Sequence, residues 1–105
     1  MSNRTLVYSP LSRCDLNEIF DYISSELENP AAAHETVNAI LDGAESLEGF
    51  PFMGSLVEGV PFLNEKYRFL PVRNYLIFYR VMDTQIFVDR ILYKKRDYSQ
   101  LLGLL

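Results

Sequence analysis

The hydrophobic positions follow a helical pattern in the first half of the chain and a strand-like pattern in the second. Strong β-formers crowd residues 66–81 and again 86–97, and polar pairs interrupt them at 73–74 and 83–84. These features predict two adjacent antiparallel hairpins, which together make a three-stranded meander at the centre of a sheet. Pro71 lies inside the first of these strands. It predicts an edge position or a bulge, because proline cannot donate a ladder hydrogen bond.

Apolar residues at three- and four-residue spacing predict two helices ahead of the meander. Ser9 and Asn29 each precede a proline and are the predicted N-caps. The first helix should end before Asn29, and Gly49 should end the second. So short a link makes the pair an antiparallel hairpin. The stripes predicted to face the core are Leu16, Ile19, Phe20, Ile23 and Leu27 in the first helix and Val37, Ile40, Leu41, Ala44 and Leu47 in the second.

The segment RTLVY at residues 4–8 is apolar and short, which is typical of an edge strand that can join the hairpins. The order of strand, helical hairpin and meander predicts an α+β fold with both helices packed on one face of the sheet. At 105 residues the chain is expected to form a single domain over residues 1–105.

The loop between the second helix and the meander, residues 50–65, carries Phe50, Phe52, Met53 and Phe62. We expect these large apolar side chains to pack down on the core. The alternative is that they form an interaction surface.

The net charge of −4 is unevenly distributed. Residues 1–65 hold two basic and eleven acidic residues, whereas residues 66–105 hold eight basic and three acidic ones. This split indicates either a basic surface that meets an acidic partner or two halves that pair with each other. No apolar run approaches the roughly 20 residues of a membrane span. The N-terminus lacks the apolar core of a signal peptide, so we expect a cytoplasmic protein without membrane partners.

With one cysteine and one histidine, the chain can form neither an internal disulfide nor a Cys/His zinc site. Phosphate-loop, dinucleotide and hydrolase motifs are also absent, so we expect no cofactor and no metal. Cys14 is predicted to be a small buried helix residue and His34 a partly buried structural one. What remains is a cluster of Arg, Lys and Tyr on the predicted sheet, which suits phosphate recognition.

Several short motifs follow one another in a fixed order. They are Y-S-P at 8–10, D-L-x-E-I at 15–19, Pro51 with Gly54, R-F-L-P-V-x-x-Y-L-I-F-Y-R-V at 68–81 and R-I-L-Y-K-K-R-D at 90–97. In this order and spacing they resemble the RelE/ParE superfamily of bacterial type II toxins over nearly the whole chain. The resemblance implies a toxin that a cognate antitoxin neutralises, with DNA reached only through the antitoxin.

The superfamily divides by target. RelE-like members cut mRNA on the ribosome, and ParE-like members poison DNA gyrase. Leu70 and Leu76 stand where RelE-like proteins carry basic residues. The sequence of residues 75–81 resembles that of ParE-like members more closely. A pI of about 4.9 also opposes approach to ribosomal RNA. The resemblance therefore implies a ParE-like toxin of a plasmid stabilisation system that inhibits DNA gyrase.

Two alternatives remain. One is a RelE-like mRNA interferase, the only case in which the protein is an enzyme, with ribosome and mRNA as partners and with Arg68, Lys95, Arg96 and Tyr98 as catalytic residues. The other is an inactive relic that only binds its antitoxin. The residues predicted to bind a partner are Arg80, Arg90, Tyr93, Lys94, Leu101 and Leu102.

Overall fold

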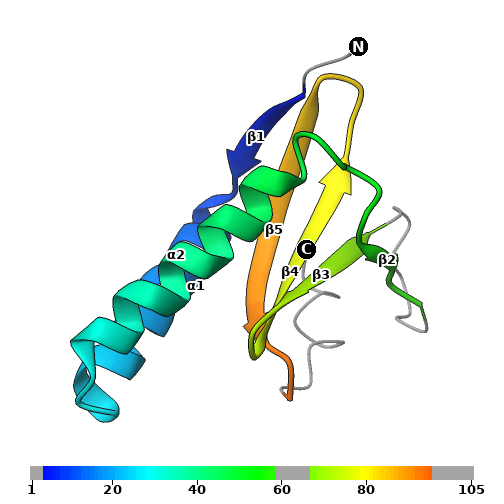
Figure 1. Ribbon diagram of the computed structural model, residues 1–105. Coiled ribbons are helices and arrows are strands. Elements are labelled where there is room, and N and C mark those ends of the chain that lie inside the picture. Colours follow the sequence, from blue (N-terminus) through cyan, green and yellow to red (C-terminus); the bar gives the residue numbers. More distant parts are fainter. Residues whose placement is uncertain (1–3, 59–66, 96–105) are drawn as a thin grey trace.

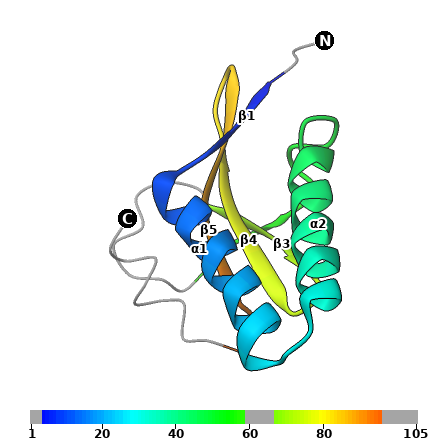
Figure 2. The same ribbon diagram turned by 90° about the vertical axis from the view of Figure 1, so that its left-hand side faces the viewer.

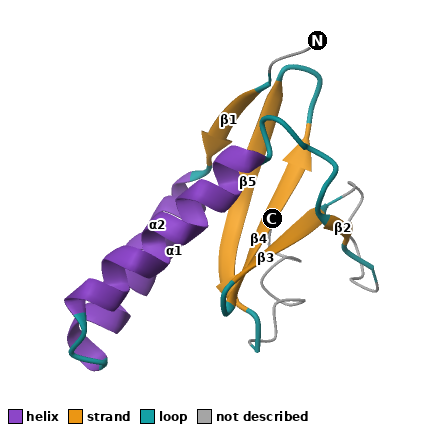
Figure 3. Ribbon diagram, viewed as in Figure 1, coloured by secondary structure: helices purple, strands orange, loops and turns teal. Residues whose placement is uncertain are grey.

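Two helices lie across one face of a five-stranded sheet in the computed structural model, which describes residues 4–58 and 67–95 (Figures 1 and 2). The predicted α+β fold with an antiparallel helical hairpin is confirmed (Figure 3). The elements are β1 (Thr5–Tyr8), α1 (Pro10–Asp21), the π-helical turn η1 (Tyr22–Glu26), α2 (Pro30–Ser46), β2 (Ser55–Leu56), β3 (Arg68–Val72), β4 (Tyr75–Val81) and β5 (Gln85–Tyr93).

The sheet has the strand order β1-β5-β4-β3-β2. Strands β3, β4 and β5 form the predicted antiparallel meander, and β1 adds to β5 in parallel. The very short β2, which the sequence did not predict, pairs only with Arg68 and Phe69. Pro71 therefore lies on a stretch of β3 whose outer side has no described neighbour, as predicted for an edge proline. The described part of the chain contains no helix long and apolar enough to cross a membrane.

Both predicted N-caps are confirmed. The Ser9 hydroxyl accepts a hydrogen bond from the Ser12 amide at 3.0 Å, and the Asn29 side chain accepts one from the Ala32 amide at 3.1 Å. Each cap thus satisfies an amide of the first turn that has no partner inside the helix. These caps and the prolines that follow them fix the residue at which each helix starts. They therefore also fix the position of the short link between the two helices.

The helical pattern changes phase near the end of the first helix. The Leu27 amide bonds to the Tyr22 carbonyl at 3.2 Å, which is the i→i+5 bond of a π-helical turn. The extra residue turns the following side chain by about 100° relative to an α-helix. Ile19 and Ile23 are buried as predicted, but Leu27 is 56 % exposed. The prediction that Leu27 faces the core is therefore wrong.

The main core lies between the helices and the sheet. It includes Ile40 and Ala44 of α2 and Ile77, Val88 and Ile91 of the central strands. A smaller cluster of Leu76, Phe78 and Leu92 lies on the opposite face of the sheet, with Val57 and Phe69 packed against it. The alternation of side chains along β4 explains the two clusters, since neighbouring residues point to opposite faces.

Two further side chains differ from the expectation. Cys14 is exposed, because the buried positions of this helical turn belong to Ser12 and Asp15. His34 is also exposed, although its ring packs edge-on against Phe20 with 4.9 Å between centroids. Apolar periodicity does not anticipate a buried carboxylate, so it places the neighbouring cysteine on the wrong side of the helix.

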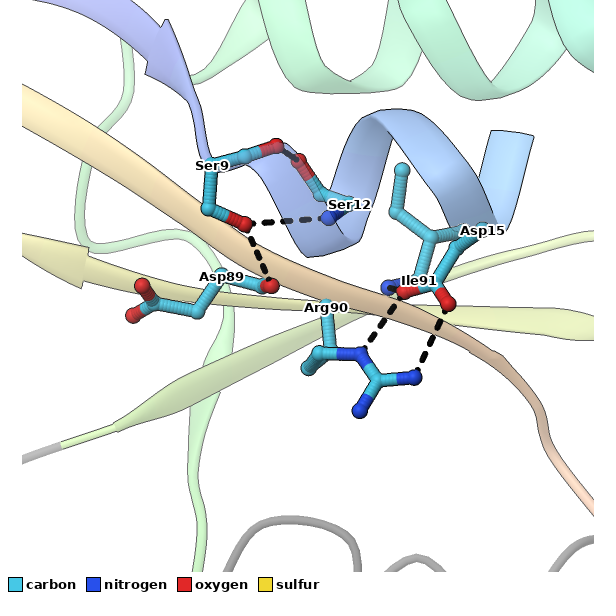
Figure 4. A network of polar contacts seen from close by, with 6 residues as sticks. All are labelled: Ser9, Ser12, Asp15, Asp89, Arg90 and Ile91. Carbon is cyan, nitrogen blue, oxygen red and sulfur yellow. Dashed lines mark hydrogen bonds and ion pairs between the residues drawn. The ribbon is translucent and has the colours of Figure 1, made fainter. Parts of the chain in front are cut away.

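Asp15 connects α1 to β5 (Figure 4). Its Oδ2 accepts hydrogen bonds from the Ile91 amide and from Arg90 Nε, both at 2.9 Å, and its Oδ1 accepts one from Arg90 Nη2 at 2.9 Å. Both side chains are largely buried, with 12 % of Arg90 and 7 % of Asp15 exposed. The bond to Asp15 raises the pKa of Arg90, since it stabilises the charged guanidinium.

These contacts occur along the outer edge of β5, beyond the point where β1 ends. β1 pairs with β5 only as far as Val88. Beyond that point, the Ser9 amide bonds to the Val88 carbonyl at 2.9 Å and the Ser9 hydroxyl to the Asp89 carbonyl at 2.7 Å. Asp15 then accepts the Ile91 amide. The start of α1 thus replaces the missing strand, because buried backbone groups need partners.

Replacing Asp15 with alanine should destabilise the fold strongly. The change leaves the buried Arg90 guanidinium and the Ile91 amide without their acceptor. We expect a loss of about 3–5 kcal/mol in the free energy of unfolding, measured by urea denaturation. Asp15→Asn retains an acceptor oxygen and should lose less. Asp21→Ala, at an exposed position of the same helix, is the control and should stay within about 0.5 kcal/mol. A loss below about 1 kcal/mol for Asp15→Ala would contradict this role.

Candidate functional site

A groove of about 790 Å³ lies between the helical hairpin and the end of the sheet where β3 turns into β4 and β5 ends. This is the lower end of the sheet in Figure 1. Helix and sheet residues contribute in similar number. The lining residues are Asp15, Glu18, Ile19, Tyr22, Ile23, Leu27, Ala32, Thr36, Arg73, Asn74, Tyr75, Ile91, Leu92 and Tyr93.

Three tyrosines gather in this groove. Tyr75 and Tyr93 face each other across β4 and β5 with ring centroids 5.7 Å apart in an edge-to-face arrangement. Burial raises the pKa of Tyr75, and the nearby Tyr93 and Tyr22 raise it further, so its phenol stays neutral at physiological pH. Tyr22 is 54 % exposed and Tyr93 is 42 % exposed. The groove therefore offers aromatic rings together with hydroxyl groups, a combination enriched at protein interfaces.

The groove has an apolar floor and a charged rim. Ile23 and Ile91 are buried beneath it, and the exposed Leu27 adds apolar surface at its helical end. Arg73 lies on the rim in the turn after β3, with a positive φ of 54°. The amide of Lys94 bonds to the Asn74 carbonyl at 2.9 Å, which holds the turn after β5 against the same rim. The sheet side of the groove is therefore basic.

Of the predicted partner-binding residues, Tyr93 lines the groove and Lys94 lies beside it, while Arg80 and Arg90 lie elsewhere. Arg80 bonds to Asp89 at 2.7 and 3.2 Å, and its guanidinium lies 5.5 Å from the ring centroids of both Tyr67 and Phe87. Both arginines thus make internal ion pairs. Leu101 and Leu102 lie outside the described residues.

Arg68, predicted to be catalytic in the RelE-like alternative, anchors the loop that follows α2. Its Nη1 donates to the Gly54 carbonyl at 2.7 Å and to the Phe52 carbonyl at 3.3 Å. Its guanidinium also lies 5.1 Å from the centroid of the Phe52 ring. Strand alternation places Arg68 on the helix side of the sheet and Arg80 on the other, so the predicted cluster of cations does not share one face.

The structure also separates Arg68 from Lys95. Arg68 pairs with Tyr79, whereas the last strand residue before Lys95, Tyr93, pairs with Tyr75. Tyr75 and Tyr79 are four residues apart along β4, which corresponds to about 13 Å. The other two predicted catalytic residues, Arg96 and Tyr98, lie outside the described residues. The two catalytic candidates that the structure describes are therefore at opposite ends of the sheet.

Tyr79 also binds the backbone of the loop that follows α2. Its hydroxyl donates to the Pro51 carbonyl at 2.9 Å and accepts a hydrogen bond from the Gly54 amide at 2.9 Å. Burial raises the pKa of this phenol, while the bond from Gly54 acts in the opposite direction. The close approach of the hydroxyl gives a physical reason for Gly54 at its position, which the sequence showed only as part of a motif.

The loop does not pack down as predicted. Phe50, Phe52 and Met53 are 70 %, 58 % and 47 % exposed. The alternative expectation, an interaction surface, fits these three side chains, while Phe62 lies outside the described residues. The sequence also contained no signal for the groove, because Leu27 continues an apolar spacing that the π-helical turn interrupts.

A helical hairpin on a small mixed sheet, with an open groove between them, defines a small α+β protein. Across residues 4–58 and 67–95, no three His, Cys, Asp or Glu side chains gather as metal ligands. The family described as the ParE toxin of the type II toxin–antitoxin system parDE matches residues 6–98. The chain belongs to this family.

Comparison with solved structures agrees at the level of the fold. A chain of the chromosomal ParDE toxin–antitoxin system from P. aeruginosa superimposes with a TM-score of 0.71 at 22 % sequence identity. The match covers 87 % of this chain and 96 % of that one. No curated protein matches the sequence.

Gly54 should not tolerate a side chain. A Cβ at this position would lie 2.6 Å from the Tyr79 hydroxyl and 2.7 Å from the Phe69 carbonyl oxygen. We expect Gly54→Ala to lower the free energy of unfolding by about 1–3 kcal/mol, because backbone or a buried ring must move. Gly49→Ala is the control, since the nearest atom there is 3.8 Å away. Equal thermal midpoints for the two variants would contradict the close approach.

Proposed function

We propose that this type II toxin acts in the cytoplasm by inhibiting DNA gyrase, and that its antitoxin occupies the groove. The main support for gyrase inhibition over mRNA cleavage is the distance between Arg68 and Lys95 along the sheet. Family membership supports a toxin with a cognate antitoxin. The choice of target and the place of the antitoxin are our proposals.

Cleavage of RNA requires several groups at one phosphate. A base, an acid and a cation must all reach the reacting atoms within about 3 Å. Arg68 and Lys95 stand at opposite ends of the sheet, and Arg68 already donates to two carbonyl oxygens. A toxin that acts by binding another protein needs no such cluster. The geometry therefore favours a non-enzymatic toxin.

The groove suits one segment of an antitoxin. Its apolar floor and exposed rings match the apolar face of an amphipathic segment, which would be an extended or helical stretch that orders on binding. The basic rim formed by Arg73 and Lys94 favours carboxylates on the same segment. We propose that Tyr93 and Lys94 bind the antitoxin, as the resemblance implied. Arg80 and Arg90 remain predictions in that role and already have internal partners.

The gyrase proposal can be tested directly. Purified gyrase would act on relaxed plasmid with increasing amounts of the protein, and supercoiling and cleaved DNA would be scored in the same lanes. We expect supercoiling to fall and linear DNA to accumulate, with both effects reversed by the antitoxin. Unchanged supercoiling at a large excess, together with cleavage of ribosome-bound mRNA, would support the RelE-like alternative instead.

The groove proposal makes a separate prediction. Leu27→Ser removes exposed apolar surface from the groove and should weaken antitoxin binding by about 1.5–3 kcal/mol, which is roughly ten- to hundredfold in Kd. Leu11→Ser is the matched control, because Leu11 is 50 % exposed on α1 but does not line the groove. Calorimetric titration with the antitoxin measures both. Equal Kd values for the two variants would place the antitoxin elsewhere.

A further inference from the structure

A second apolar surface lies far from the groove. Phe50, Phe52, Met53 and Leu56, all in or beside the loop after α2, are 70 %, 58 %, 47 % and 44 % exposed. We call these four side chains the Phe52 patch. Exposed apolar side chains scattered singly need no explanation, but several in one loop indicate an interaction site. None of them lines the groove.

The backbone beneath the patch is held firmly. The Tyr79 hydroxyl binds Pro51 and Gly54, and Arg68 binds the carbonyls of Phe52 and Gly54. These bonds keep the side chains pointing outward when they could otherwise fold onto the core. A rigid apolar surface loses little conformational entropy on binding, which is a property of interface hot spots.

Two cations flank the centre of the patch. The guanidinium of Arg4 lies 5.7 Å from the centroid of the Phe52 ring, and that of Arg68 lies 5.1 Å from it. Arg4 is itself fixed, since its Nε donates to the Met82 carbonyl at 2.8 Å. The chain as a whole carries a net charge of −4, so a cationic spot around an apolar ring is distinctive. It favours an apolar pocket with carboxylates at its border.

The position of the patch argues for a partner other than the antitoxin segment in the groove. Arg68 begins β3, whereas the groove lies beyond the other end of that strand, at Arg73. Strand β3 has five residues, so the two surfaces are separated by roughly 15 Å of sheet. A toxin needs a surface for its target as well as one for its antitoxin.

We propose that the Phe52 patch docks onto the toxin's protein target, in an apolar pocket bordered by carboxylates. Phe52 enters the pocket, and Arg4 meets the carboxylates, while Arg68 holds the backbone of the patch. The inference rests on the proposed function, because it requires that the toxin acts on a protein.

The test uses the full chain with Phe52→Ser and Met53→Ser together. Both side chains are exposed, so the fold should persist, and antitoxin binding should stay within about twofold of wild type. The concentration that inhibits gyrase should rise roughly tenfold or more, and growth arrest on expression without antitoxin should be lost. Leu11→Ser, which removes an equally exposed side chain outside both surfaces, should change neither readout.

Charge reversal tests the border of the pocket. Arg4→Glu should weaken inhibition more at low salt than at high salt, since screening reduces the new repulsion. Inhibition equal to wild type at low salt would overturn the acidic border.

The remaining outcomes are also decisive. Full inhibition and full growth arrest by the double variant would overturn the docking role of the patch. Loss of antitoxin binding in a folded double variant would assign the patch to the antitoxin and overturn the proposal. If wild type arrests growth without inhibiting gyrase, the gyrase proposal fails, and the growth readout still decides the patch. A wild-type chain that affects neither overturns both.

Discussion

The Asp15 carboxylate is the contact on which the arrangement of helices and sheet depends. β1 is four residues long and leaves the second half of β5 without a strand on its outer edge. Asp15 accepts the Ile91 amide there and neutralises Arg90 in the same place. One buried side chain therefore completes a sheet edge and fixes the position of α1. Because Asp15 and Ile91 also line the groove, the same contact sets the distance between its helical and sheet walls.

Tyr79 has the corresponding role at the other end of the sheet. Its ring belongs to the core, and its hydroxyl reaches the backbone of the loop after α2 at Pro51 and Gly54. Gly54 is required because a side chain would meet this hydroxyl. Phenylalanine would pack equally well at this position. Only the tyrosine hydroxyl, however, can form hydrogen bonds with the two backbone groups. The two ends of the molecule thus carry different surfaces on one rigid sheet.

Local signals predicted most of the fold. The caps at Ser9 and Asn29, the turns at 73–74 and 83–84 and the meander are each fixed by a few neighbouring residues, so sequence alone suffices for them. The exposure of Leu27 was not predictable, because a π-helical turn leaves the apolar spacing unchanged. Nor was the separation of Arg68 from Lys95, which depends on strand register across the sheet. The exposure of the loop at Phe52 was only the alternative expectation, because composition cannot distinguish a buried aromatic side chain from an exposed one.

The basic residues of the second half of the sequence have two kinds of surroundings in the structure. The pair between Arg90 and Asp15 joins the basic half to the acidic half, and it is buried, so it serves the fold. Arg80 is paired within its own half, with Asp89. Among the described side chains, Arg73, Lys94 and Lys95 are exposed and form no ion pair, and Arg73 and Lys94 lie at the rim of the groove. The interpretation that the two halves pair with each other is therefore confirmed for Arg90, and a basic surface that meets an acidic partner stays a prediction. Arg80 and Arg90 therefore take part in the fold through their ion pairs, whereas the cations at the turns are solvated. Solvated charges guide association more than they add stability, which is why we propose Arg73 and Lys94 as contacts for a partner.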